Sequence, residues 1–217
     1  MSVAPWTLVC AGATVALVAS EYRASAAGRW VSKPLASLAF VGLALSQGDP
    51  GSSYGRAVLA ALVLCLLGDL LLLPDRTGPA FIGGLASFLG GHVAFSVAFV
   101  ALDPDWAWTG AAAVALALPV VGALRWLGPH LQGRLRVAVP IYVVAIGAMV
   151  ALAAGAARSA GPWWVGPAAI LFFLSDLAVA RQRFVQRDWR NRLWGLPLYY
   201  AAQLLFALSI LDYSPNG

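Results

Sequence analysis

Charged residues are scarce in this sequence. They make up 11% of its 217 residues, whereas a soluble domain is about one quarter charged. Hydrophobic residues account for 61%, and the mean hydropathy is +0.80. This composition excludes an ordinary soluble domain and indicates a membrane protein, because long uncharged apolar runs are typical of membrane spans. We expect one helical domain over residues 1–217, with no room for a separate soluble domain.

Cysteine and histidine are also rare. The two cysteines, Cys10 and Cys65, both fall in apolar segments and suggest neither a disulfide framework nor a metal-binding knuckle. The two histidines, His92 and His130, are too few for a catalytic zinc, which typically takes three protein ligands. The sequence has no D-x-x-D pair for magnesium and no G-x-S-x-G motif of a serine hydrolase. We therefore expect no metal and no cofactor.

What the sequence has in abundance is apolar runs, which predict an all-α transmembrane bundle. Eight spans are expected, at residues 3–21, 33–46, 57–73, 81–101, 107–124, 137–157, 163–181 and 194–211. The second is cleanly apolar only between Leu35 and Leu45, which is also typical of a re-entrant segment or a buried core helix. No basic residue precedes the first run and Arg23 follows it, which is the wrong charge order for a cleaved signal peptide.

The basic residues select the topology. With eight spans, 12 of the 14 lysines and arginines fall on one side of the membrane, and the other side keeps Arg56 and Arg158. Without the second span, the split degrades to 9 against 5. The positive-inside rule therefore predicts eight spans, a cytoplasmic basic side and both termini outside. The same residues are expected to contact lipid headgroups, not nucleic acid. Abundant Arg, Ala and Gly favour a bacterial inner membrane.

Two aspartates lie inside stretches that are apolar enough to span a membrane. Asp69 sits in LVLCLLGDLLLL, residues 62–73, and Asp176 in AAILFFLSDLAVA, residues 168–180. A carboxylate in hydrocarbon costs about 2.5–3.5 kcal/mol, so such a residue usually faces a polar cavity and has a function there. At about 1.5 Å per residue, Asp69 is expected about 6 Å and Asp176 about 7.5 Å from the cytoplasmic ends of their helices. A lone Asp can simply hydrogen-bond a neighbouring helix, but two at one depth favour a site.

Further polar residues of the predicted spans are expected at or near the same depth, with His92 and Gln203 deeper, close to the bilayer midplane. Glycines beside them, such as Gly68, would let the helices approach closely. We expect a polar pocket that opens to the cytoplasmic leaflet and is walled by Leu, Phe and Ala, which suits an amphiphile with its head at the interface. The candidate binding residues are Lys33, Ser87, His92, Tyr142, Ser175, Tyr199, Tyr200 and Gln203.

These candidates also have purely structural interpretations. Lys33 can be an anchor that extends to the interface, and His92 can be a hydrogen-bonded packing residue. Tyrosines can belong to an interfacial aromatic belt, and Ser175 can bond back to its own helix. Tyr199 and Tyr200 point about 100° apart on a helix, so at most one is expected to face the pocket centre.

The ordered set of motifs resembles the YhhN-like lysoplasmalogenase family of polytopic membrane proteins. The motifs are short, but they occur in order over about 170 residues. Where family members commonly have a tyrosine three residues after the histidine, this chain has Phe95, so no hydroxyl role is expected there. The matching pieces are Lys33-Pro34-Leu35, Gly68-Asp69, residues 84–99 with Phe88 and His92, Tyr142, residues 171–184 with Ser175 and Asp176, and residues 199–205 with Tyr199, Tyr200 and Gln203.

The resemblance implies hydrolysis of the vinyl-ether bond of a lysoplasmalogen, which releases a fatty aldehyde and glycerophosphoethanolamine or glycerophosphocholine. Protonation of the outer alkene carbon gives an oxocarbenium ion, which water captures; glycosidases meet a similar ion with a pair of carboxyl groups. A close Asp69–Asp176 pair is expected to share one proton, so that one donates it and the other stabilises the cation. Lys33 is expected to hold the substrate phosphate.

Other functions fit part of the pattern. Buried aspartates also serve proton relays, so a small transporter or proton-coupled carrier is an alternative, although no internal repeat of the transporter type is visible. A non-catalytic lipid-binding protein and a hydrolase of a related lysophospholipid are the others. The expected partners are a lysophospholipid and the surrounding membrane lipids.

Overall fold

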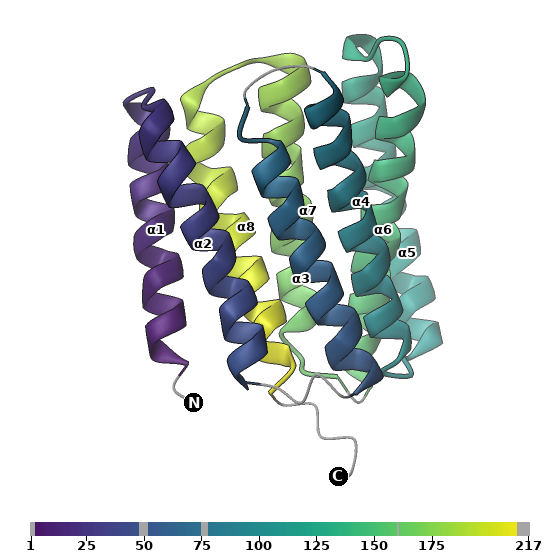
Figure 1. The fold of residues 1–217 in the computed structure, drawn as a ribbon. Helices are drawn as coiled ribbons and strands as arrows, with labels where there is room; N and C mark the ends of the chain where they lie inside the picture. The colour runs from purple at the N-terminus through teal and green to yellow at the C-terminus, as the bar shows by residue number, and fades with distance from the viewer. Residues whose placement is uncertain (1–2, 48–51, 75–77, 160, 212–217) are drawn as a thin grey trace.

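The computed structural model describes residues 3–47, 52–74, 78–159 and 161–211, which form eight α-helices that run side by side (Figure 1). The predicted all-α class and the helix count are confirmed, and the described residues contain no strand. The helices are α1 (Ala4–Tyr22), α2 (Ala26–Gln47), α3 (Ser53–Leu71), α4 (Pro79–Val100), α5 (Trp106–Leu127), α6 (Leu135–Arg158), α7 (Val165–Ala180) and α8 (Trp189–Ser209). A 3-10 turn, η1 (Gly128–His130), follows α5, and a π-helical turn, η2 (Arg181–Val185), follows α7.

Five helices in the described part of the chain are long and apolar enough to cross a membrane: α1, α3, α4, α6 and α5 together with η1. α7 has only 16 residues, and the first turns of α2 and α8 both carry arginine. The chain is thus an integral membrane protein of eight helices. α1 begins and α8 ends at the same end of the bundle (Figure 1). The sidedness of that end stays a prediction.

The second predicted span is longer than its apolar run suggested. α2 covers Ala26–Gln47, 22 residues, which corresponds to about 33 Å at the helical rise. It packs against α1, α3 and α8. Its 22 residues are too many for a short re-entrant segment, and its exposed Leu35, Leu38 and Leu45 are not typical of a buried core helix. The prediction, which began at Lys33, missed residues 26–32 because Arg29 interrupts the apolar pattern there.

Six helices form a closed ring. Each packs against the next in the order α2, α3, α4, α6, α7 and α8, and α8 returns to α2. α1 lies outside this ring against α2 and α8, and α5 lies outside it against α6, at the opposite edge of the bundle in Figure 1. Polar side chains that point into the ring therefore come from segments far apart in the sequence.

Glycine lets α3 and α4 approach closely beside the ring interior, as the sequence predicted. A Cβ atom added to Gly68 would lie 2.7 Å from the ring of Phe88, well inside contact distance. A Cβ at Gly91 would lie 3.0 Å from Sγ of Cys65. The backbones of α3 and α4 are therefore close together at Gly68 and Gly91, the residues that precede Asp69 and His92.

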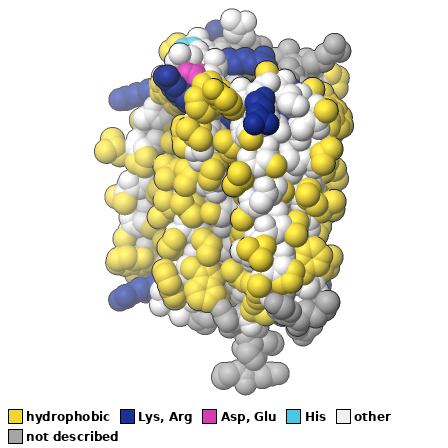
Figure 2. All heavy atoms as spheres, turned by 90° about the vertical axis from the view of Figure 1, so that its left-hand side faces the viewer, with side chains coloured by type: hydrophobic (Ala, Val, Ile, Leu, Met, Phe, Trp, Pro, Cys, Tyr) yellow, Lys and Arg dark blue, Asp and Glu magenta, His cyan; other side chains and the backbone are white. Residues whose placement is uncertain are grey.

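The flank of the bundle is apolar and its end is basic. Figure 2 shows hydrophobic side chains over the side that α1 and α2 cover, with lysine and arginine gathered mainly at the upper end. Large apolar side chains such as Leu8, Val15 and Leu118 are at least 70% exposed. Such a surface is stable only against lipid tails.

Candidate active site

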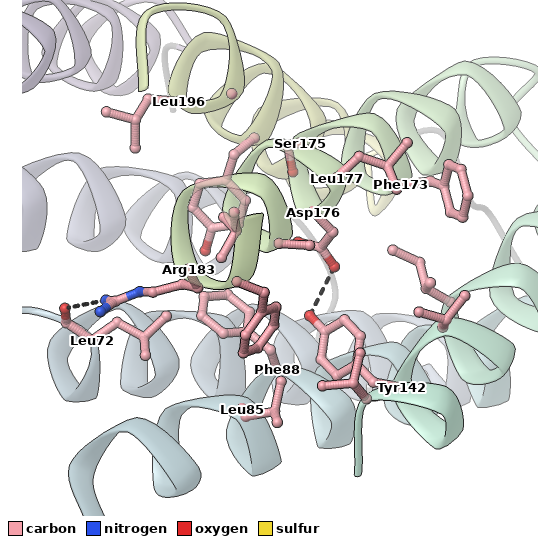
Figure 3. Close-up of a pocket in the computed structure, with 18 of the residues that line it drawn as sticks. Leu72, Leu85, Phe88, Tyr142, Phe173, Ser175, Asp176, Leu177, Arg183 and Leu196 are labelled. Carbon is pink, nitrogen blue, oxygen red and sulfur yellow. Dashed lines mark hydrogen bonds between the residues drawn. The ribbon is translucent and has the colours of Figure 1, made fainter. Parts of the chain in front are cut away.

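A pocket opens inside the six-helix ring, and every helix of the ring contributes to its lining. Its cavity volume is about 90 Å³. Most of the wall is apolar, with Leu85, Phe88 and Phe173 among its members (Figure 3). The polar side chains of the wall are Lys33, Asp69, Tyr142, Ser175, Asp176, Arg183, Arg192 and Tyr199. Both predicted aspartates thus face one cavity.

Asp69 is bound by a cation and two hydroxyl groups. Its Oδ1 lies 3.1 Å from Nζ of Lys33, and the two side chains are 3% and 11% exposed. Its Oδ2 accepts hydrogen bonds from Ser37 at 2.7 Å and from Tyr199 at 2.8 Å. Charge-assisted bonds of this length are stronger than neutral ones, because the ionised oxygen attracts the donor hydrogen more strongly. The structure therefore presents Asp69 as a charge-compensated acceptor.

The two adjacent tyrosines of α8 take different positions, as the 100° separation predicted. Tyr199 lines the pocket. Tyr200 lies behind it, 2% exposed, with its hydroxyl 3.3 Å from Oγ of Ser37 and donating to the carbonyl of Lys33 at 3.4 Å. Tyr200 thus supports the residues that bind Asp69 instead of facing the cavity.

Asp176 has a different set of partners. Its Oδ2 accepts a hydrogen bond from the Tyr142 hydroxyl at 2.7 Å (Figure 3). The same oxygen lies 3.1 Å from Nε2 of His92, which is itself 2.9 Å from the Tyr142 hydroxyl. Within the described residues, neither Oδ1 of Asp176 nor Nδ1 of His92 has a hydrogen-bond partner. One carboxyl oxygen of Asp176, whose side chain is 16% exposed, remains available to a molecule in the pocket.

The two carboxyl groups line one pocket but belong to separate hydrogen-bond networks. In the described part of the chain no hydrogen bond joins Asp69 to Asp176. The expectation that a close Asp69–Asp176 pair shares one proton stays a prediction. Lys33 and two hydroxyl groups bind Asp69, whereas His92 and Tyr142 bind only Oδ2 of Asp176.

Three other predicted binding residues present no free polar group to the pocket. Ser87 does not line the pocket, since its hydroxyl donates to the carbonyl of Leu64 and ties α4 to α3. Ser175 lines the pocket, but its hydroxyl bonds back to the carbonyl of Phe172 in its own helix. Gln203 is fully buried and does not line the pocket. Its amide has no hydrogen-bond partner among the described residues.

The residues around His92 are aromatic. Its ring packs 4.6 Å from that of Phe172, and His92 is 0% exposed, so it reaches the pocket only through Asp176 and Tyr142. Phe95, one turn along α4, is also fully buried, with its ring 4.2 Å from that of Phe206. An apolar ring thus occupies the place where a hydroxyl is common in the family that the sequence resembles.

The sequence reasoning missed three side chains of the site. Ser37 follows Lys33 by one helical turn, and this i, i+4 spacing was an available signal. Arg183 and Arg192 line the pocket. The sequence had suggested only that these arginines mark the cytoplasmic side and contact lipid headgroups. Burial, and then the nearby Arg192, lowers the pKa of the Arg183 guanidinium to about 10, so this group is still charged at neutral pH. Its Nη2 donates to the carbonyl of Leu72 at 3.4 Å (Figure 3).

Comparison with known proteins identifies relatives over most of the chain. A model of the YhhN family matches residues 28–210. The chain is 33% identical over 162 residues to a protein named lysoplasmalogenase TMEM86B from Sus scrofa, which covers 75% of this chain and 66% of the relative. It is 32% identical over 177 residues to a lysoplasmalogenase from Mycobacterium bovis, which covers 78% of this chain and 66% of the relative.

A human relative gives a similar result. The chain is 32% identical over 161 residues to lysoplasmalogenase TMEM86A from Homo sapiens, which covers 71% of this chain and 65% of the relative. The matched region therefore spans just under two thirds of the length of each of these three proteins. No solved structure matches the chain.

Proposed function

Because this chain belongs to the YhhN family, we propose that it hydrolyses the vinyl-ether bond of lysoplasmalogens to a fatty aldehyde and glycerophosphoethanolamine or glycerophosphocholine. The names of its relatives favour this reaction. The observation that carries the proposal is the place of Asp176 in an apolar pocket. One of its oxygens is held by Tyr142 and His92, and the other is without a protein partner among the described residues.

Asp176 is the proton donor in this proposal. Among the described residues no lysine or arginine forms an ion pair with this carboxyl group, and the pocket around it is mostly apolar. Oδ1 of Asp176 transfers its proton to the outer alkene carbon, where a C–H bond forms from the π electrons, and the ether oxygen stabilises the resulting oxocarbenium ion. Tyr142 and His92 hold Oδ2, so the acid stays oriented toward the substrate and its conjugate base is hydrogen-bonded once the proton has left.

The second half of the reaction returns the proton. Water attacks the carbon of the oxocarbenium ion and gives up a proton to the Asp176 carboxylate, which leaves a hemiacetal. Collapse of the hemiacetal breaks the bond between this carbon and the glycerol oxygen. The aldehyde and a free glycerol hydroxyl result, with one water consumed. Asp69 supplies the fixed negative charge that faces the cation, while Lys33 keeps the resting pocket close to neutral.

The basic residues around the pocket support an assignment of the active site to one leaflet. Lys33, Arg183 and Arg192 line the pocket, and lysine and arginine gather mainly at one end of the face that Figure 2 shows. By the positive-inside rule this end faces the cytoplasm. We therefore place the active site toward the cytoplasmic leaflet, and in a bacterium the inner membrane is the corresponding location.

A lipid panel tests the function directly. The purified chain in detergent is incubated with three ethanolamine lysolipids that carry a vinyl-ether, a saturated ether or an ester at the same position. We expect aldehyde, detected by mass spectrometry, from the vinyl ether alone. Fatty acid from the ester lipid instead would identify a different lysophospholipid hydrolase. Uptake of the intact lipid or of protons into proteoliposomes, with no product from any lipid, would identify a carrier.

A further inference from the structure

A second cavity adjoins the pocket at the basic end of the bundle. We call it the vestibule. Its volume is about 190 Å³, and its charged lining consists of Glu21, Arg29, Lys33, Arg187, Asp188 and Arg192. Lys33, Leu72, Arg192 and Leu196 line both the vestibule and the pocket. The two cavities are therefore neighbours across a shared wall, one largely apolar and the other largely charged.

Arg192 lines both the pocket and the vestibule and is the cation best placed to bind a ligand group between them. It comes from the first turn of α8, and its side chain is 15% exposed. Its Nε lies 3.9 Å from Oε1 of Glu21, which is too long for a hydrogen bond. Nε has no hydrogen-bond partner in the described part of the chain. A buried guanidinium with an unused donor is suited to an incoming oxyanion, which it binds in a fork geometry.

Glu21 lies between two arginines. Nη1 of Arg29 is 3.8 Å from Oε2 of Glu21, and Nε of Arg192 is 3.9 Å from its Oε1. Glu21 is the only glutamate of the chain, and its side chain is 20% exposed. Both ion pairs are long, so the carboxylate leaves room for another cation. The vestibule thus offers guanidinium groups and a carboxylate within one small cavity.

Lys33 is committed elsewhere. Its ammonium lies 3.1 Å from Asp69, and withdrawing it would leave that carboxylate buried without its counter-ion. The phosphate role that the sequence suggested for Lys33 therefore suits Arg192 better. Arg183 is also engaged, because it stacks 5.2 Å from the Phe81 ring and donates to Leu72.

We infer that the vestibule binds the zwitterionic phosphodiester headgroup of the lysolipid, with the phosphate on Arg192 and Arg29 and the amine on Glu21. This inference rests on the proposed function and assigns the headgroup of its substrate to a particular cavity and its residues. The order of the cavities matches the order of groups along such a lipid. The charged head occupies the vestibule, the glycerol passes the shared wall at Lys33 and Leu196, and the chain occupies the apolar pocket.

Binding of uncleavable lipids tests the headgroup site without turnover. The probes are a saturated-ether lysophosphatidylethanolamine and the corresponding alkylglycerol, which lacks the phosphate and the amine. Arg192→Gln is expected to weaken binding of the phospholipid about 10-fold or more, since a charge-assisted contact is lost, and to leave the alkylglycerol unchanged. Arg190→Gln is the matched control, because Arg190 is exposed on the same helix and lines neither cavity.

The proposed contact between Glu21 and the amine of the headgroup is tested separately. Glu21→Gln is expected to weaken binding of the ethanolamine lipid several-fold, while an alkyl lysophosphatidate without the amine binds as tightly as to the unmodified protein or more tightly. Equal losses for both lipids would overturn the amine assignment. The phosphate assignment would be overturned if Arg192→Gln weakened binding of the phospholipid and of the alkylglycerol equally, or weakened neither. It would also be overturned if Arg190→Gln weakened phospholipid binding to the same extent.

The outcomes are separable from those of the proposed reaction. A protein that binds the phospholipid through Arg192 but releases no aldehyde from a vinyl-ether lipid supports the headgroup site and contradicts the hydrolase proposal. A protein that releases aldehyde while Arg192→Gln binds normally supports the hydrolase and contradicts the headgroup site.

Discussion

Nζ of Lys33 lies 3.1 Å from Oδ1 of Asp69, and the two side chains are 11% and 3% exposed. This ion pair joins α2 to α3 inside the ring. It also distinguishes the two carboxyl groups of the pocket, because Asp176 has a phenol and an imidazole as neighbours in place of an ammonium. Two residues that look equivalent in the sequence thus have different chemical surroundings in the structure.

Replacing Asp176 by Asn is expected to reduce the rate of aldehyde release about 100- to 10,000-fold, the usual contribution of a general acid. Asn keeps the volume of the side chain but cannot donate the proton and return to a carboxylate. The measurement is kcat for a vinyl-ether lysolipid, with thermal unfolding in detergent as the check on folding. A well-folded variant with near-normal turnover would exclude Asp176 as the acid.

Tyr142→Phe is expected to lower kcat about 10-fold, because the carboxyl of Asp176 loses the hydroxyl that orients it. The variant keeps the ring and its packing against His92, 5.0 Å between centroids. Tyr22→Phe is the control, since Tyr22 is 67% exposed on α1 and lines neither cavity. Equal rates for both variants would show that the Tyr142 hydroxyl does not support the reaction.

Asp69→Asn is expected to lower the free energy of unfolding by up to about 3 kcal/mol, because the Lys33 ammonium loses its buried partner. Lys33→Met in the same chain removes the orphaned charge, so the double variant is expected to be more stable than Asp69→Asn alone. Thermal unfolding of the two single variants and the double variant gives the coupling energy. Strictly additive effects would mean that the ion pair contributes nothing to stability.

Gly68→Ala is expected to destabilise the protein and reduce turnover, because the new methyl group would lie 2.7 Å from the Phe88 ring that lines the pocket. Either the ring or α4 must move, and overpacking of this kind costs about 1–3 kcal/mol. Gly110→Ala is the control, since its Cβ would meet nothing within 4 Å. A Gly68→Ala variant as stable and active as Gly110→Ala would contradict the close packing of α3 and α4 at the site.

The sequence by itself determined the helical class, the helix count and the burial of Asp69, because these follow from apolar runs and from the cost of placing a charge in hydrocarbon. It also placed both aspartates at one level. What it did not determine is which side chains touch. Lys33 and Ser37 on one helix bind Asp69 on the next, whereas Tyr142 and His92 bind Asp176.

Those pairings were decided by the tertiary structure. Depth along a helix follows from residue counting, but the direction in which a side chain points depends on how each helix is rotated in the ring. That rotation is set by packing against two or more neighbours, as where Gly68 meets Phe88. Partners such as Tyr199 and Asp69 are separated by 130 residues of chain. Only the closed ring of helices brings such residues within hydrogen-bonding distance.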